Sequence, residues 1–329
     1  MKAVLCEELG PPERLKMREI ADPTPKAGEV LIAVEACGVN FPDTLIIEGK
    51  YQFKPDLPFS PGGEVAGIID AVGEGVSPDR IGEAVIAMAG FGGFAEKMVM
   101  PENQLLPRPK GMTGQMAAGF TMTYGTSMHA LKQRANLQPG ETLLVLGAGG
   151  GVGLAAVELG KLMGARVIAA ASSAEKLAAA KAAGADDLIN YTETPLRDAV
   201  KALTGKNGVD VVYDPVGGEL FEQALRVTAW RGRVLVVGFA SGEIPNVAVN
   251  LALLKGCAIV GVFWGAFRTR ELALDNANFA QMFKWYAQGK LHPHISKAYP
   301  LDDAALALSD LKERRVIGKV VLTTGTENG

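Results

Sequence analysis

Residues 143–153 read L-L-V-L-G-A-G-G-G-V-G, an apolar run followed by a cluster of glycines. The uninterrupted apolar run predicts a strand buried on both faces, and the glycines predict a sharp turn into a helix that begins near Gly151. The N–H groups of such a turn can approach an anion closely, and the positive end of the helix favours negative charge. Gly147, Gly150 and Gly153 fit a G-x-x-G-x-x-G spacing but not the strict dinucleotide pattern G-x-G-x-x-G. Because a plain glycine turn explains the same letters, the residues that follow must decide whether phosphate binds here.

A helix and a second strand follow the glycines. Apolar residues recur at helical spacing over 154–163, and 166–170 is a short apolar run, so the unit is β-α-β. In NAD-binding folds a carboxylate about 20 residues past the glycines binds the ribose 2′-hydroxyl. Here Ser172, Ser173 and Lys176 offer hydrogen-bond donors and positive charge instead, which favours NADPH over NADH. Ser173 can also cap the following helix while Lys176 lies in solvent, and both interpretations can hold together.

Composition narrows the class of protein. A chain of 329 residues is long enough for two domains with substantial cores. The net charge of −3 argues against nucleic acid or an anionic membrane as a partner. The N-terminus has no secretory pattern and no apolar run approaches the length of a membrane span, so we expect a cytoplasmic protein. Three cysteines, far apart in sequence, predict reduced and mostly buried thiols.

The order of elements predicts an α/β protein with two folding patterns. Residues 1–110 show short strands with frequent glycine and proline, which is typical of a barrel, and 113–131 is helical. Repeated α/β units then predict a doubly wound parallel sheet. The helical patterns at 271–289 and 302–314 are expected to cover the first domain. We therefore predict domains at 1–122, 123–263 and 264–329, the last returning to the first.

Several motifs together resemble one superfamily. They are G-V-N-F-P-D-T at 38–44, P-G-G-E-V-A-G at 61–67, T-Y-G-T-S at 123–127, A-G-G-G-V-G at 148–153 and G-K-V-V-L at 318–322. The chain resembles the medium-chain dehydrogenase/reductase superfamily and, within it, the zinc-free NADPH:quinone oxidoreductases, the ζ-crystallin-like branch. The resemblance implies a GroES-like β-barrel catalytic domain and a Rossmann NADPH-binding domain.

The positions that carry zinc ligands in the alcohol dehydrogenases of this superfamily hold other residues here. A cysteine is replaced by Asn40 and a histidine by Gly63, and neither is a normal zinc ligand. Nothing between residues 88 and 112 supplies the cysteine cluster of a structural zinc lobe. His292 and His294 flank a proline and are interpreted as exposed turn residues. We predict no metal site.

Without a metal, the predicted reaction is hydride transfer from NADPH to an acceptor that needs little activation, such as a quinone. An enone or enoyl thioester is the alternative acceptor. The spacing of Asn40, Asp43, Gly49 and Tyr51 resembles the segment that bears the proton-donor tyrosine of enoyl thioester reductases. Quinone oxidoreductases share this segment. A non-enzymatic, crystallin-like NADPH-binding protein is a third possibility. Leu45 stands where quinone reductases often have a tyrosine, which makes the acceptor pocket more apolar.

Two residues are candidates for the chemistry. The resemblance implies that the Asn40 amide faces the nicotinamide or the acceptor and that Tyr51 donates a proton or binds substrate. Each has a structural alternative, because Asn40 can be a turn residue and Tyr51 an amphipathic wall. Asp43 is interpreted as a cap of the next helical turn and is left out of the chemistry.

The resemblance also implies the cofactor contacts and the assembly. Cofactor-binding residues are predicted at Asn40, Thr126, Gly150, Gly151, Val152, Ser172, Lys176, Tyr191, Gly238, Phe239, Phe263 and Lys319. The apolar strand at 258–263 would be an exposed sheet edge in a monomer, and its pairing with a second copy predicts a homodimer.

Overall fold

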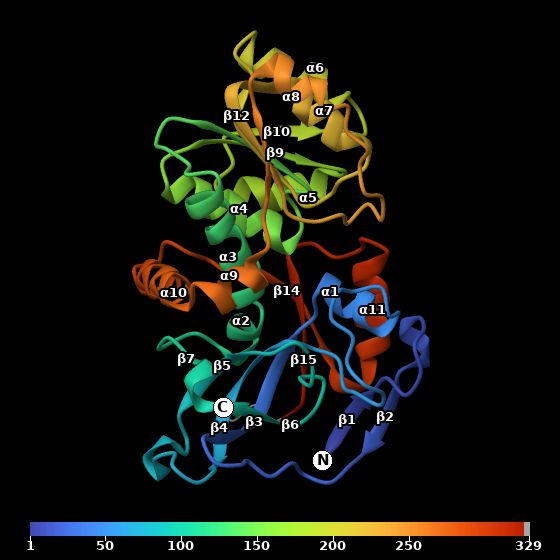
Figure 1. Cartoon of the computed structure of the whole chain (residues 1–329), viewed down its shortest axis with the longest axis vertical. Coiled ribbons are helices and arrows are strands. Elements are labelled where there is room, and N and C mark those ends of the chain that lie inside the picture. Colours follow the sequence, from blue (N-terminus) through green and yellow to red (C-terminus); the bar gives the residue numbers. More distant parts are fainter. Residues whose placement is uncertain (326–329) are drawn as a thin grey trace. The chain divides into compact units, whose positions relative to one another are not determined.

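The computed structural model describes residues 1–325, and the chain divides into two compact units (Figure 1). Unit 1 comprises Met1–Met122 and Pro293–Gly329, and unit 2 comprises Thr123–His292. The chain thus returns to unit 1 at Pro293, whereas the sequence analysis placed the return at residue 264. Helix α3 (Thr121–Met128) contains the first boundary.

The segment between residues 264 and 292 belongs to unit 2, and two aromatic contacts are among those that join it to the rest of that unit. Phe267 stacks on His129 at 4.0 Å between ring centroids, and the Trp264 ring lies so close to Gly125 that a β-carbon there would be 2.6 Å from it. Both partners are in unit 2, on α3 and the π-helical segment η4 (His129–Arg134). Sequence periodicity identifies such an apolar helix face but not the surface on which it packs.

Unit 1 is built on an open, barrel-like sheet with the strand order β14-β15-β3-β4-β5-β7, in which β6 also pairs with β3. Its strands are β1 (Lys2–Leu5), β2 (Lys16–Glu19), β3 (Glu29–Gly38), β4 (Glu64–Val72), β5 (Ala84–Met88), β6 (Lys97–Pro101), β7 (Leu105–Pro107), β14 (Ile295–Pro300) and β15 (Lys319–Thr323). Its helices are α1 (Phe41–Ile47), α2 (Gly114–Ala118) and α11 (Ala304–Lys312), with short 3-10 turns η1 (Pro12–Arg14), η2 (Pro78–Arg80), η3 (Glu102–Gln104) and η5 (Leu301–Asp303). The predicted β-rich domain is confirmed.

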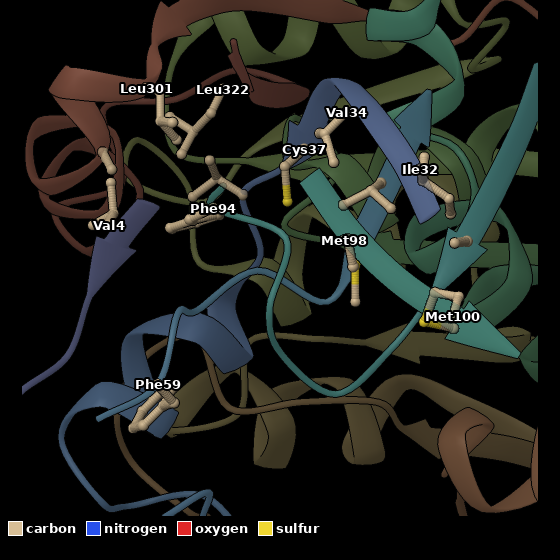
Figure 2. Close-up of a cluster of buried hydrophobic side chains, with 14 of the residues drawn as sticks. Val4, Ile32, Val34, Cys37, Phe59, Phe94, Met98, Met100, Leu301 and Leu322 are labelled. Atoms are coloured by element: carbon tan, nitrogen blue, oxygen red, sulfur yellow. The ribbon is translucent and has the colours of Figure 1, made fainter. Parts of the chain in front are cut away.

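Strands from the two ends of the chain meet in this sheet. β15 pairs antiparallel with β3, so that Val321 lies opposite Gly38, and Figure 1 shows these red and blue strands side by side. The apolar residues of β3, β4 and β6 alternate toward one core, where Figure 2 shows Ile32, Cys37 and Phe94 among the buried side chains. Burial of this alternating face sets the strand register.

Unit 2 is a parallel sheet with the strand order β10-β9-β8-β11-β12-β13. Its strands are β8 (Thr142–Leu146), β9 (Arg166–Ala171), β10 (Asp187–Asn190), β11 (Val209–Asp214), β12 (Thr228–Val236) and β13 (Ala258–Gly261). Its helices are α4 (Gly151–Leu162), α5 (Ala174–Ala182), α6 (Leu196–Thr204), α7 (Glu219–Val227), α8 (Asn250–Lys255), α9 (Trp264–Arg270) and α10 (Leu272–Ala287). The predicted doubly wound Rossmann sheet is confirmed, with β8 in its interior as the apolar run required.

Three further expectations can be compared with the structure. The cysteines are all free, and Cys6 and Cys37 are buried. Within residues 1–325, no helix is long and apolar enough to cross a membrane. The same part of the chain holds no cluster of three or more His, Cys, Asp or Glu side chains arranged to bind a metal ion.

Candidate active site

The structure places the predicted site residues in two groups, one in each unit. In unit 1, Asn40, Glu64 and Lys319 form a polar cluster, and all three are at least 94% buried, with 6%, 0% and 6% of their surface exposed. Asn40 follows β3, Glu64 begins β4 and Lys319 begins β15, so the pairing of these strands brings the three side chains together.

Hydrogen bonds determine which way the Asn40 amide points. The Lys319 ammonium donates to Asn40 Oδ1 at 2.5 Å and to the Val39 carbonyl at 2.8 Å. Asn40 Nδ2 donates to Glu64 Oε2 at 3.0 Å and to the Gly38 carbonyl at 3.3 Å. An ammonium can only donate and a carboxylate only accepts. The opposite amide orientation would therefore break the bond from Lys319 and the bond to Glu64. Asn40 therefore links the cation to the anion, and its predicted contact with the nicotinamide or acceptor stays a prediction.

Glu64 also holds the start of α3. Its Oε1 accepts a hydrogen bond from the Thr121 hydroxyl and another from the Met122 N–H, each at 2.8 Å. Its Oε2 lies 3.3 Å from the Lys319 ammonium. Each oxygen of this buried carboxylate is thus compensated, as burial of a charge requires. The Lys319 ammonium hydrogen-bonds within this cluster, and its predicted contact with the cofactor stays a prediction.

Asp43 and Tyr51 lie on the α1 side of the cluster. Asp43 accepts a hydrogen bond from the Asn40 N–H at 2.8 Å, so the capping role expected from the sequence is present. Burial raises the pKa of Asp43 to about 6, against the lowering effect of hydrogen bonds from the backbone of Asn40 and Gly62. Tyr51 follows α1 and packs half-buried against the core of unit 1. Burial and the nearby Asp43 raise the pKa of its phenol, which therefore keeps its proton at neutral pH.

In unit 2 the glycine turn has the predicted strand-turn-helix form. β8 ends at Leu146, Gly147 has a φ of +57°, and α4 begins at Gly151 with Gly150 as its N-cap. A β-carbon on Gly153 would lie 2.3 Å from the Gly147 carbonyl oxygen, so only glycine lets the turn fold onto the helix. The N–H groups of a first helical turn have no acceptor within the helix, so those of Gly151 and Val152 can bind an anion.

Ser172 and Tyr191 lie at the carboxyl ends of neighbouring strands, and Lys176 lies in the first turn of α5. Ser172 follows β9, Tyr191 follows β10, and the Tyr191 N–H donates to the Ala171 carbonyl at 3.2 Å. Ser173 caps α5, since its hydroxyl accepts from the Lys176 N–H at 3.3 Å. The three predicted adenosine-side residues are therefore brought together.

Lys176 also lies against the glycine turn. A β-carbon added to Gly149 would be 2.5 Å from the Lys176 β-carbon, so the lysine stem crosses this glycine. The turn and the predicted 2′-phosphate pocket are thus parts of one surface within unit 2, and these residues fit a phosphorylated dinucleotide.

Three of the remaining predicted contacts follow other strands of the same sheet, and the fourth lies on a helix. Gly238 and Phe239 come after β12, and a β-carbon on Gly217, which follows β11, would be 2.9 Å from the Phe239 ring. Phe263 is the N-cap of α9, two residues past β13, and is 61% exposed. Thr126 lies on α3. Parallel strands end at one edge of a sheet, where ligands of such folds bind.

Sequence reasoning missed several polar residues that support these groups. Glu64 was quoted in a motif without a role, although an acidic residue at the start of an apolar strand signals a buried partner. Ser127, Tyr213 and Glu158 were not singled out. Glu158 is buried on α4 and accepts a hydrogen bond from Tyr124, and burial raises its pKa. Periodic apolar patterns hide such residues, because a polar side chain with a partner takes a core position.

Two family models match the chain. Residues 26–110 match the alcohol dehydrogenase GroES-like domain, and residues 151–284 match the zinc-binding dehydrogenase family. Among similar proteins, a quinone oxidoreductase-like protein 2 homolog of Nematostella vectensis is 40% identical over 98% of this chain and 89% of its own length.

Two solved structures are similar to this chain over 98% of its length. A mycobacterial protein complexed with NADPH is 33% identical, with a TM-score of 0.91 over 98% of this chain and 100% of that one. The quinone oxidoreductase of Escherichia coli complexed with NADPH is 29% identical, with a TM-score of 0.90 over 98% of this chain and 100% of that one.

Proposed function

Because the chain belongs to the quinone oxidoreductase branch of the medium-chain dehydrogenase/reductase superfamily, we propose that it is an NADPH-dependent oxidoreductase that reduces a quinone or a similarly activated acceptor without a metal ion. The observation that carries the metal-free proposal is the bonding of Asn40 to Glu64 and Lys319. The cofactor proposal is supported by the glycine turn and by the pocket of Ser172, Lys176 and Tyr191.

The cluster in unit 1 is chemically unsuited to a divalent cation. The position of a ligand cysteine holds an amide whose oxygen already accepts from Lys319. The Lys319 ammonium lies 3.3 Å from Glu64, so a zinc ion bound by this carboxylate would meet a positive charge beside it. Lys319 therefore supplies the positive charge of the cluster, and the acceptor must be reactive enough to need no Lewis acid.

NADPH, when bound, supplies a hydride to the acceptor. We assign the pyrophosphate to the N–H groups of Gly151 and Val152 and the 2′-phosphate to Lys176 and Ser172. Positive charge and hydroxyl donors favour a phosphate there, where a carboxylate would repel it. Gly238, Phe239 and Phe263, which follow strands of the same sheet, and Thr126 on α3 complete the proposed contacts.

The proton requirement separates the two candidate reactions. A reduced quinone can take its protons from solvent, whereas reduction of an enone or enoyl thioester needs a positioned donor at the α-carbon. Tyr51 is the proposed donor in the second case. Its raised pKa keeps the proton on the phenol at neutral pH, so the residue is available as an acid. The enoyl thioester reductase is therefore the second candidate, and a non-enzymatic NADPH-binding role is the third.

We further propose a homodimer and a cytoplasmic location. β13 is the last strand of the parallel sheet, and Ile259 on it is 40% exposed, which suits pairing with the same strand of a second copy. The free thiols and the reductant NADPH suit the cytoplasm.

A direct test compares NADPH oxidation with a small 1,4-quinone and with a 2-enoyl-CoA at matched concentration, followed at the nicotinamide absorbance. We expect faster turnover of the quinone and weak activity with NADH. Faster turnover of the thioester would make the protein an enoyl reductase. NADPH binding without turnover of any acceptor would support the non-enzymatic role.

Tyr51→Phe then separates the first two candidates by residue. It should leave quinone reduction nearly unchanged, whereas a proton-donor role predicts a loss of about a hundredfold or more in kcat with the thioester and little change in KM. Tyr286→Phe on α10 is the matched control, because it removes a phenol from outside the candidate site.

A further inference from the structure

A buried series of two hydrogen bonds ends at the first turn of α4. The Ser127 hydroxyl on α3 lies 3.0 Å from the Val152 carbonyl oxygen and 2.9 Å from the Tyr213 hydroxyl on β11. Ser127 and Tyr213 are both 0% exposed. These three residues are far apart in sequence, and all lie in unit 2.

The direction of this series follows from its members. A carbonyl oxygen only accepts, so the single Ser127 proton must go to Val152, and Tyr213 must donate to the Ser127 oxygen. Burial raises the pKa of the Tyr213 phenol, which keeps that proton in place. The hydrogen bonds therefore run from Tyr213 through Ser127 to Val152, and both hydroxyl groups are uncharged at neutral pH.

The target of the series is the first turn of α4. The Val152 carbonyl shares a planar peptide group with the Gly153 N–H, so a bond to the oxygen also sets the direction of that N–H. The same first turn carries the N–H groups of Gly151 and Val152, and Gly153 packs against the Gly147 carbonyl. The hydrogen bond from Ser127 therefore fixes the peptide that adjoins these donors, within the first turn of α4.

We propose that Ser127 and Tyr213 are positioning residues for the cofactor, which hold the first turn of α4 in the orientation that binds the pyrophosphate of NADPH. This inference rests on the proposed function, which assigns the pyrophosphate to that turn. Neither residue touches the cofactor in this proposal. They set the affinity for the dinucleotide and leave the affinity for its adenosine half unchanged.

Two ligands test this by isothermal titration calorimetry. NADPH contains the pyrophosphate, whereas adenosine 2′-monophosphate has the 2′-phosphate and no pyrophosphate. For Ser127→Ala we expect the Kd of NADPH to rise about tenfold, as for a lost buried hydrogen bond with an unpaired partner, and the Kd of adenosine 2′-monophosphate to stay within about twofold. Ser127→Thr, which keeps the hydroxyl, should restore most of the NADPH affinity.

Three further variants keep the test informative. Tyr213→Phe fills the same space and should raise the Kd of NADPH about threefold, so it serves if Ser127→Ala does not fold. Thr228→Val removes another buried hydroxyl of unit 2, which bonds the Ala224 carbonyl at 2.9 Å, and should change neither Kd. Lys176→Met should raise the Kd of both ligands.

The outcomes separate this inference from the proposed function. Unchanged binding of NADPH in Ser127→Ala, or an equal loss for both ligands, overturns the positioning role while leaving the cofactor site intact. If the wild-type protein binds NADPH no more tightly than adenosine 2′-monophosphate, the pyrophosphate assignment itself fails, and this inference fails with it.

Discussion

In unit 1, charge is held by side chains, since Lys319, Asn40 and Glu64 bond to one another in the interior. In unit 2, the proposed anion site is made by the backbone of the turn at 147–153, and the side chains there are mostly absent because its residues are glycines. The cluster in unit 1 should lose stability when one of its bonded side chains is removed. The turn in unit 2 should lose its anion site when a side chain is added to a glycine, so the two units should respond to opposite kinds of substitution.

Lys319→Met should have the largest effect on stability. It keeps the length of the side chain but leaves the buried Glu64 carboxylate without its cation, and we expect unit 1 to lose about 3–5 kcal/mol. Hydrogen exchange of the β3 and β15 amides measures this loss. Arg18→Met is the control, because its pair with Glu7 is exposed, and it should change nothing measurable. Equal protection in Lys319→Met and wild type would show that the cluster carries no essential charge pairing.

Asp43 gives unit 1 a pH dependence of a defined sign. Its pKa is raised from 3.8 to about 6 in the folded protein. Between about pH 4 and about pH 6 the folded protein therefore keeps a proton on Asp43, whereas the unfolded chain has released it. The ionised group therefore destabilises unit 1 above about pH 6, by at most about 3 kcal/mol, and this cost disappears as the pH falls toward 4.

Asp43→Asn should remove this dependence. The unfolding free energy of the variant, measured with urea relative to wild type, should improve as the pH rises from about 4.5 to 7.5. Asp22→Asn is the control, since hydrogen bonds from Lys97 and the N-terminal ammonium lower the pKa of Asp22 from 3.8, so its difference from wild type should stay constant over this pH range. A difference between Asp43→Asn and wild type that is constant with pH would contradict the prediction.

Gly150→Ala and Gly153→Ala test the backbone-made site. A methyl on Gly153 would meet the Gly147 oxygen at 2.3 Å, whereas one on Gly150 would lie 3.4 Å from it and suits the φ of −86° there. Gly153→Ala should lower both the Tm and the NADPH affinity. Gly150→Ala should keep the Tm and weaken NADPH about tenfold to a hundredfold, because the methyl stands where the phosphate approaches. Wild-type affinity in Gly150→Ala would place the phosphate elsewhere.

Among these substitutions in unit 2, Lys176→Met should have the smallest effect on NADPH affinity. It removes a side-chain charge from the proposed site in unit 2, which is otherwise made mostly by the backbone. Loss of a charge-assisted bond to the 2′-phosphate should raise the Kd of NADPH about tenfold and leave that of NADH unchanged. Lys181→Met on the same helix α5 is the matched control, since Lys181 donates to the Ala185 carbonyl. An equal loss for NADPH and NADH would show that Lys176 does not read the phosphate.

The sequence predicted most of the local structure of unit 2. The apolar run before Gly147 became β8, and Ser173 became the cap of α5, because strand burial and capping depend on neighbours within a few residues. The return of the chain was placed at 264, whereas unit 2 continues to His292, because Trp264 and Phe267 pack on α3 and η4.

By itself, the sequence determined the α/β class, the glycine turn and the polar residues after β9 and β10, since each depends on spacing along a short stretch of chain. Only the tertiary structure decided that Lys319 bonds Asn40, a residue 279 positions away, and that hydrogen bonds connect Tyr213 through Ser127 to Val152. The physical reason is that a buried polar residue needs a partner but does not specify where in the chain that partner lies. Strand pairing and helix packing supply it, and these depend on the whole fold.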